Sequence, residues 1–217
     1  MAHPIVYGPA GSTYVWSARL ALAEKGVTHE LVDVPFGAHR QEPHLSRQPF
    51  AKVPAFEHDG FALYETQAIL RYIDGAFPGA PLRPSELKRL ARMDQLIGIC
   101  DWYLFPQVAV TIAFQRIVKP LFMGGTPDEE IIKGAIPNAE RCFAVIAGFL
   151  ESRQGAYLTG AQLSIADIMI ACHMSMLVAT PECAAIIARH AALRDWLTRI
   201  EARPSMQNTD LMPRKAA

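Results

Sequence analysis

The first part of the chain alternates between short apolar segments and stretches with helical spacing. Four segments are short and apolar enough to be predicted as strands: 4–7, 29–34, 52–57 and 61–63. Asp59-Gly60 separates the last two of them and is a typical β-hairpin signal. Residues 14–25 and 65–77 are predicted helices, and in the second of these the apolar positions recur at helical spacing (Ile69, Leu70, Ile73 and Phe77).

A segment rich in proline and glycine, residues 78–85, divides this part from the rest of the chain. Everything after it has helical spacing: a long helix over about 86–118, then a helix that Thr126-Pro127 starts, and further helices to Arg203-Pro204. We therefore expect an α/β domain over 1–78, a linker over 79–87 and an all-α helical-bundle domain over 88–217. Strand-helix-strand followed by hairpin-helix is typical of the thioredoxin-like fold, with a mixed four-stranded sheet.

Composition and charge exclude several classes of function. Lys+Arg and Asp+Glu balance at 21 each, so no overall field attracts nucleic acid or an anionic membrane. The longest apolar stretch, 96–118, contains Asp101, Gln107 and Arg116, and we expect no transmembrane span there. The start of the chain has no signal-peptide pattern, and the four cysteines have no metal-ligand spacing. These features predict a cytoplasmic protein without a metal, whose cysteines are free and buried.

The stretch KVPAFEHDGFALYET contains the residues that indicate a binding site. Pro54 lies at the start of a strand, where a missing N–H is tolerated, and a cis Val53–Pro54 bond would turn a backbone edge towards a ligand. Glu65 and Thr66 place a hydroxyl and unpaired N–H groups at a helix N-terminus, where a carboxylate binds well. Together these residues predict a site for a small, extended, peptide-like acid.

Three separated segments resemble the cytosolic glutathione transferase superfamily, in the order found there. They are the opening IVYGPAGSTYVWSARLALAEKG, the stretch HLSRQPFAKVPAFEHDGFALYETQAILRYI, and LSIADIMIA in the C-terminal half. The resemblance covers most of residues 4–210 and is closest to the Ser-type classes, especially the plant phi class. It implies that glutathione is a co-substrate, that no metal is needed, and that the second substrate is a hydrophobic electrophile bound between the domains.

Ser12 is the predicted catalytic residue, because it follows a Gly8–Gly11 turn and precedes a helix. A free thiol has a pKa near about 8.5, and lowering it by about two units requires roughly 2.7 kcal/mol. A helix N-terminus supplies about 0.3–2 kcal/mol and a hydroxyl hydrogen bond to an anion about 1.5–3 kcal/mol. Ser12 can also be read as a helix cap alone. Tyr7 is the main rival, because it ends the first strand, where the Tyr-type classes carry their thiolate-stabilising phenol, and Thr13 is a weaker second rival.

The resemblance also implies how glutathione is held. His39 and Arg40 correspond to the phi-class His-Lys pair at the glycine carboxylate, and Lys52 stands where Gln is usual. Val53, beside Pro54, is expected to bind the cysteinyl portion through its backbone. At the γ-glutamyl end, Glu65 is expected to take the ammonium group and Thr66 the carboxylate.

Two further motifs complete the expectations. Ser164-Ile165-Ala166-Asp167 has the spacing of a capping box, with Asp in place of Glu, and predicts a structural rather than a catalytic role for Asp167. Phe50 matches the aromatic residue that inserts into the partner subunit in several transferase classes, and so favours a homodimer. Glutathione-dependent peroxidase, dehalogenase or isomerase activity, or non-catalytic glutathione binding, are alternatives that share the fold.

Overall fold

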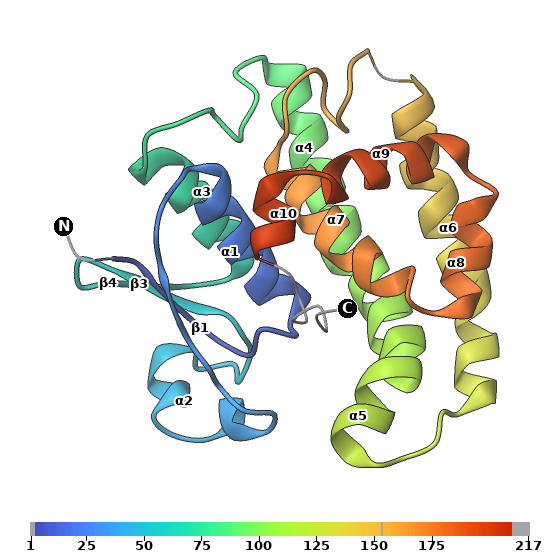
Figure 1. The fold of residues 1–217 in the computed structure, drawn as a ribbon, viewed down its shortest axis with the longest axis horizontal. Coiled ribbons are helices and arrows are strands. Elements are labelled where there is room, and N and C mark those ends of the chain that lie inside the picture. The colour runs from blue at the N-terminus through green and yellow to red at the C-terminus, as the bar shows by residue number, and fades with distance from the viewer. Residues whose placement is uncertain (1–2, 153, 210–217) are drawn as a thin grey trace. The chain divides into compact units, whose positions relative to one another are not determined.

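The computed structural model describes residues 3–152 and 154–209 of the chain. These residues form two compact units: the first contains residues 3–83 together with 203–209, and the second contains the described residues between Pro84 and Ala202 (Figure 1). The first unit contains a sheet, and the second is built from helices.

A small mixed sheet forms the centre of the first unit. Its strands are β1 (Ile5–Tyr7), β2 (Glu30–Val32), β3 (Ala55–His58) and β4 (Phe61–Tyr64), in the spatial order β2-β1-β3-β4. β1 pairs in parallel with β2 and antiparallel with β3, which forms the hairpin with β4. Asp59 and Gly60 both have positive φ, at 49° and 76°, as the favoured two-residue hairpin turn requires. The predicted mixed four-stranded sheet is confirmed.

Two longer helices pack against each other in the first unit (Figure 1). They are α1 (Thr13–Glu24) and α3 (Thr66–Ala76). The same unit contains three short helices, η1 (Ala38–Arg40), α2 (His44–Arg47) and α10 (Pro204–Asn208). α3 buries Ile69, Leu70 and Ile73, three of the four apolar positions that the sequence placed on one helix face.

The chain after the helical domain returns to the first unit. Arg203 Nε and Nη2 donate to the Glu24 carboxylate at 2.7 and 2.6 Å, and Ser205 also donates to Glu24. Trp16 Nε1 donates to Thr209 Oγ1 at 3.1 Å, so α10 is fixed along α1. The domain prediction assigned all of 88–217 to the helical domain. The described residues 203–209 instead group with the first unit, and Arg203, Ser205 and Thr209 have polar partners on α1.

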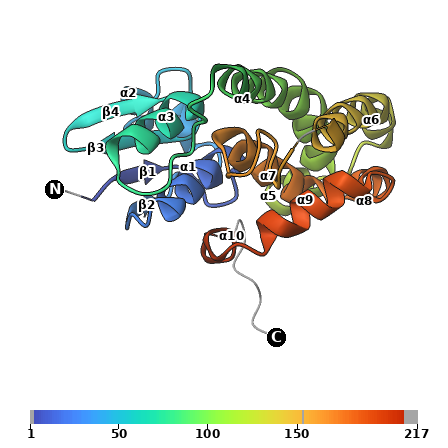
Figure 2. The same cartoon turned by 90° about the horizontal axis from the view of Figure 1, so that it is seen from above.

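The regular secondary structure of the second unit is helical in its described residues, apart from one isolated bridge between Tyr157 and Gly160. Its helices are α4 (Leu87–Ile99), η2 (Cys100–Val118), α5 (Lys119–Met123), α6 (Glu129–Ser152), α7 (Ile165–Leu177), α8 (Pro181–Ala188) and α9 (Ala191–Glu201). η2 has the wider hydrogen-bond ladder of a π-helix, and α6 contacts η2, α8 and α9 (Figure 2).

The run from α4 to α5 is one helix, Leu87–Met123, and by length and composition alone it is apolar enough to cross a membrane. The core helix of a soluble protein passes the same test. Here η2 packs against α6 and α7, and its Arg116 is bound by two carboxylates of this unit.

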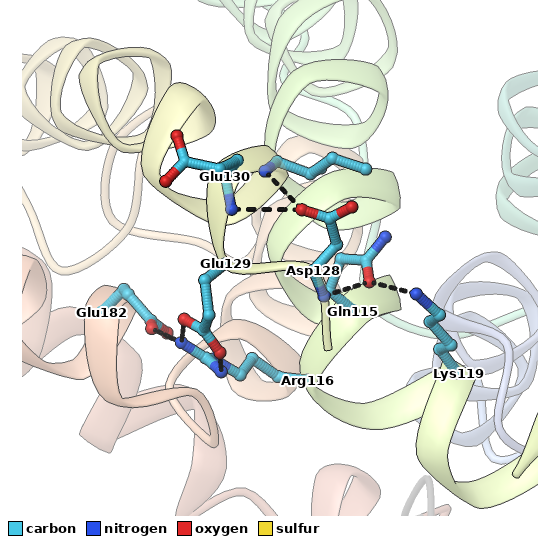
Figure 3. A network of polar contacts seen from close by, with 8 residues as sticks. Gln115, Arg116, Lys119, Asp128, Glu129, Glu130 and Glu182 are labelled. Atoms are coloured by element: carbon cyan, nitrogen blue, oxygen red, sulfur yellow. Dashed lines mark hydrogen bonds and ion pairs between the residues drawn. The ribbon is translucent and has the colours of Figure 1, made fainter. Parts of the chain in front are cut away.

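Those carboxylates belong to a polar network that joins three helices (Figure 3). Arg116 on η2 binds both oxygens of Glu129 at 2.6 and 2.8 Å, and its Nε donates to Glu182 on α8 at 3.0 Å. Gln115 Oε1 accepts from the backbone N–H of Asp128 at 2.9 Å and from Lys119 Nζ at 3.2 Å. The first turn of α6 is therefore fixed to η2 by bidentate and charge-assisted bonds.

The capping box at the start of α7 is present as predicted. Ser164 Oγ accepts from the backbone N–H of Asp167, and Asp167 accepts from the backbone N–H of Ser164 at 3.0 Å. Asp167 also accepts from the Leu158 backbone at 2.8 Å and from Trp196 Nε1 at 2.8 Å. Its carboxylate is wholly buried, and burial raises its pKa despite these donors. The structural role expected for Asp167 follows from these contacts.

Candidate functional site

The turn after β1 brings the backbone close to the start of α1. A side-chain carbon at Gly8, where φ is 152°, would overlap Val15 and come within 3.2 Å of Cβ of Val53, so only glycine fits. Ser12 follows as the N-cap of α1, and its Oγ accepts weakly from the Val15 N–H at 3.4 Å. Among the described residues no acceptor is recorded for the Ser12 hydroxyl proton. That proton is therefore available to an anion at the N-terminus of a 12-residue helix.

Tyr7, the rival residue, has its phenol directed across the sheet. The hydroxyl donates to Glu57 Oε2 on β3 at 3.1 Å, and the Arg47 guanidinium lies over the ring at 4.4 Å from its centroid. Burial, and then the Glu57 carboxylate, raise the pKa of Tyr7 against a smaller opposing effect of Arg47. A phenol that is bound to a carboxylate and has a raised pKa is a poor donor to a thiolate.

The segment before β3 is fixed from α2. The Val53–Pro54 bond is cis, the form considered from the sequence, and Glu42–Pro43, which was not foreseen, is cis as well. Gln48 Oε1 accepts from the backbone N–H of Lys52 at 3.2 Å, and His44 Nε2 lies 2.7 Å from the Lys52 carbonyl oxygen. The Lys52 side chain is exposed, Val53 is half-buried and Pro54 is buried.

Glu65 and Thr66 begin α3 as the sequence predicted. Glu65 is the N-cap and has φ 70° and ψ 112°, a conformation that L-residues rarely adopt and that costs about 1–3 kcal/mol. Its side chain makes no capping hydrogen bond and is exposed. Thr66 is buried. The first N–H groups of α3 thus lie next to Glu65, a strained residue whose carboxylate makes no capping hydrogen bond.

The remaining predicted residues, His39 and Arg40, form a basic group together with Lys52. His39 and Arg40 lie on η1, His39 half-buried and Arg40 exposed. Burial, and then the nearby charges of Arg40, His44 and Lys52, lower the pKa of His39. An anion placed among these groups would offset that mutual repulsion. Among the described residues, no three His, Cys, Asp or Glu side chains are grouped so as to hold a metal ion.

Reasoning from the sequence missed the residues behind the site. His44 and Gln48 lie outside the predicted strands and helices, and Glu57 was predicted only as part of a strand. Nothing local marks Glu57, because it meets Tyr7 across 50 positions of the chain and only through the register of β1 and β3.

Comparison with known proteins assigns the chain to a family. The model of the glutathione S-transferase N-terminal domain matches residues 3–75, and that of the C-terminal domain matches residues 129–199. The chain belongs to the glutathione S-transferase family. Within this family it is similar to a probable glutathione S-transferase of Oryza sativa subsp. japonica, with 29% identity over 91% of this chain and 92% of that protein.

Glutathione S-transferase 4 of Zea mays is 32% identical, over 94% of this chain and 92% of its own length. A solved glutathione S-transferase I, bound with lactoylglutathione, has a TM-score of 0.86 and 28% identity, over 97% of this chain and all of that one (100%). The phi-like resemblance and the fold class, a thioredoxin-like domain followed by a helical domain, are thereby confirmed.

Proposed function

We propose that this glutathione S-transferase family member activates glutathione as a thiolate and transfers it to hydrophobic electrophiles. The supporting relatives carry the name glutathione S-transferase, and one solved relative is in complex with an atrazine glutathione conjugate. The single observation that carries the assignment of Ser12 is the contrast with Tyr7. Ser12 has an available hydroxyl proton at a helix N-terminus, whereas the Tyr7 phenol donates to Glu57.

The chemistry asked of Ser12 is modest. Its hydroxyl donates a hydrogen bond to the glutathione sulfur and keeps its own proton, while the thiol proton leaves to solvent. Lowering a thiol pKa by two units requires roughly 2.7 kcal/mol, which the hydroxyl and the α1 N-terminus supply together. The thiolate then attacks an electrophilic carbon, so that a C–S bond forms and the leaving group departs with its electron pair.

The ligand contacts we propose place the two ends of glutathione on opposite parts of the site. The glycine carboxylate binds the basic group of His39, Arg40 and Lys52. The backbone of Val53, beside Pro54, pairs with the cysteinyl portion.

At the other end, Glu65 takes the γ-glutamyl ammonium group. Thr66, with the first N–H groups of α3, takes the γ-glutamyl carboxylate. The strained backbone of Glu65 supports a ligand-binding role for this residue, because backbone strain of this kind is common at ligand sites.

We also propose a cytoplasmic homodimer. Phe50 supports the dimer, because 66% of its surface is exposed next to Tyr64, at 6.0 Å between ring centroids. Four free, buried cysteines support a reducing compartment.

The test is a titration of bound glutathione by its thiolate ultraviolet absorbance. In the unmodified protein the thiol pKa should lie about two units below that of free glutathione. Ser12→Ala should return it most of the way, with about a 10- to 100-fold loss of kcat/KM for an activated aryl chloride at pH 6.5. Tyr7→Phe is the matched control that also removes one hydroxyl, and it should change the thiol pKa little.

Two outcomes would refute the proposal. Glutathione that binds with an unchanged thiol pKa would mean a non-catalytic binding protein. If Tyr7→Phe abolished conjugation while Ser12→Ala left it intact, the catalytic residue would be Tyr7.

A further inference from the structure

Both backbone polar groups of Lys52 are held by side chains of the α2 segment. The N–H of Lys52 donates to Gln48 Oε1 at 3.2 Å, and Gln48 Oε1 also accepts from the Phe50 N–H at 2.7 Å. The carbonyl oxygen of Lys52 lies 2.7 Å from His44 Nε2. The hydrogen bond from the imidazole is the shorter of the two at Lys52.

His44 is built into the protein rather than displayed on its surface. Only 2% of its surface is exposed, although it is the first residue of a four-residue helix that follows three exposed residues, Gln41, Glu42 and Pro43. A carbonyl oxygen can only accept, so Nε2 must carry a proton for this bond to form. Nδ1 is buried and has no recorded hydrogen-bond partner. When the proton is on Nε2, Nδ1 is an unprotonated acceptor, and leaving it unpaired costs less than leaving a buried N–H unpaired.

The carbonyl of Lys52 and the N–H of Val53 belong to one planar peptide group. Because that group is trans, its C=O and N–H point in opposite directions, and fixing the oxygen also fixes where the N–H points. No partner is recorded for the Val53 N–H among the described residues, so this donor is available to a ligand.

We infer that His44 is a positioning residue for glutathione: it holds the Lys52 carbonyl so that the Val53 N–H is presented to the cysteinyl portion of the ligand. This rests on the proposed glutathione site. His44 makes no contact with the ligand itself and acts through the Lys52–Val53 peptide. The bond lies wholly within the protein, so we expect it to lower the ordering cost of binding rather than the barrier of the chemical step.

Three substitutions of His44 separate this role from simple packing. His44→Phe keeps a planar ring and removes the donor. His44→Gln places an amide nitrogen the same number of bonds from Cα as Nε2, whereas His44→Asn places it one bond short, at the position of Nδ1. Ser46→Ala is the matched control, because Ser46 lies on the same short helix and its hydroxyl donates to Glu42 rather than to Lys52.

The measurements are the dissociation constant of glutathione, KM for glutathione and kcat with an activated aryl chloride, and the pKa of the bound thiol. His44→Phe and His44→Asn should raise KM and the dissociation constant about three- to tenfold, the usual worth of one hydrogen bond. kcat at saturating glutathione and the thiol pKa should stay unchanged. His44→Gln should restore KM to within about twofold of the unmodified protein, and Ser46→Ala should leave it unchanged.

The inference is overturned if His44→Phe binds glutathione like the unmodified protein, or if the loss falls on kcat or the thiol pKa. It is also overturned if His44→Gln binds glutathione as weakly as His44→Asn. This comparison still tests the inference if His44→Phe does not fold, as judged by its thermal midpoint. If the unmodified protein does not bind glutathione at all, the proposed function fails together with this inference. If it binds and conjugates while the His44 variants are unaffected, only this inference fails.

Discussion

Removing the Asp167 carboxylate should be among the most damaging single changes in the helical unit. Asp167→Ala removes the acceptor of four buried donors: the N–H groups of Leu158 and Ser164, the Ser164 hydroxyl and Nε1 of Trp196. Each buried, unpaired donor costs about 1–3 kcal/mol, and the lost helix cap adds about 1 kcal/mol. Water that enters the new cavity recovers part of this. We therefore expect a loss of about 3 kcal/mol or more, a large share of the 5–15 kcal/mol typical of a folded domain.

Equilibrium unfolding in urea measures this loss, with the free energy of unfolding obtained by linear extrapolation. All variants should be compared at one protein concentration, because dimerisation would add a concentration-dependent contribution. Asp195→Ala is the matched control. Asp195 is on α9, 66% of its side chain is exposed, and its only recorded partner among the described residues is Arg194 at 3.7 Å. It should change stability by less than about 0.5 kcal/mol.

Asp167→Asn gives a second measurement if the alanine variant does not fold. It keeps the side-chain volume and one acceptor oxygen, so its loss should lie between those of Asp167→Ala and the control. If Asp167→Ala and Asp195→Ala destabilised the protein equally, the four hydrogen bonds to Asp167 would not be contributing what their burial implies.

Two further predictions follow from burial and exposure. Burial lowers the pKa of His173 to about 4, against a smaller opposing effect of its bond to the Met169 carbonyl. In the unfolded chain the His173 imidazole takes up a proton near pH 6.5. The free energy of unfolding should therefore fall as pH drops from about 6.5 towards 4. His173→Leu should flatten that slope, as measured by thermal unfolding at several pH values. Phe50→Ala should raise the dissociation constant of the proposed dimer about 10- to 100-fold, because burying one large apolar side chain contributes about that much. Phe61→Ala, on the exposed β4 strand, serves as the control. Sedimentation velocity on dilution measures both variants, and a monomeric unmodified protein would contradict the dimer.

Several features of this protein could be read from the sequence because their causes are local. The hairpin at Asp59-Gly60, the helix that starts at Thr66 and the Ser164–Asp167 capping box each depend on residues within about four positions of one another. Local signals also compete. Thr126-Pro127 predicted the start of a helix, but α6 begins at Glu129, because the Asp128 carboxylate accepts from the N–H groups of Glu130 and Ile131.

The sequence by itself determined the two kinds of domain and nominated both Ser12 and Tyr7 for the thiolate. Only the tertiary structure shows how their surroundings differ, because the register of β1 against β3 places Glu57 where it binds the Tyr7 phenol. The packing of α10 on α1 was hidden for the same reason, because Arg203 meets Glu24 across 179 positions of the chain. Periodicity and turn chemistry specify each element, whereas the partner of a polar side chain is fixed only when folding brings distant elements together.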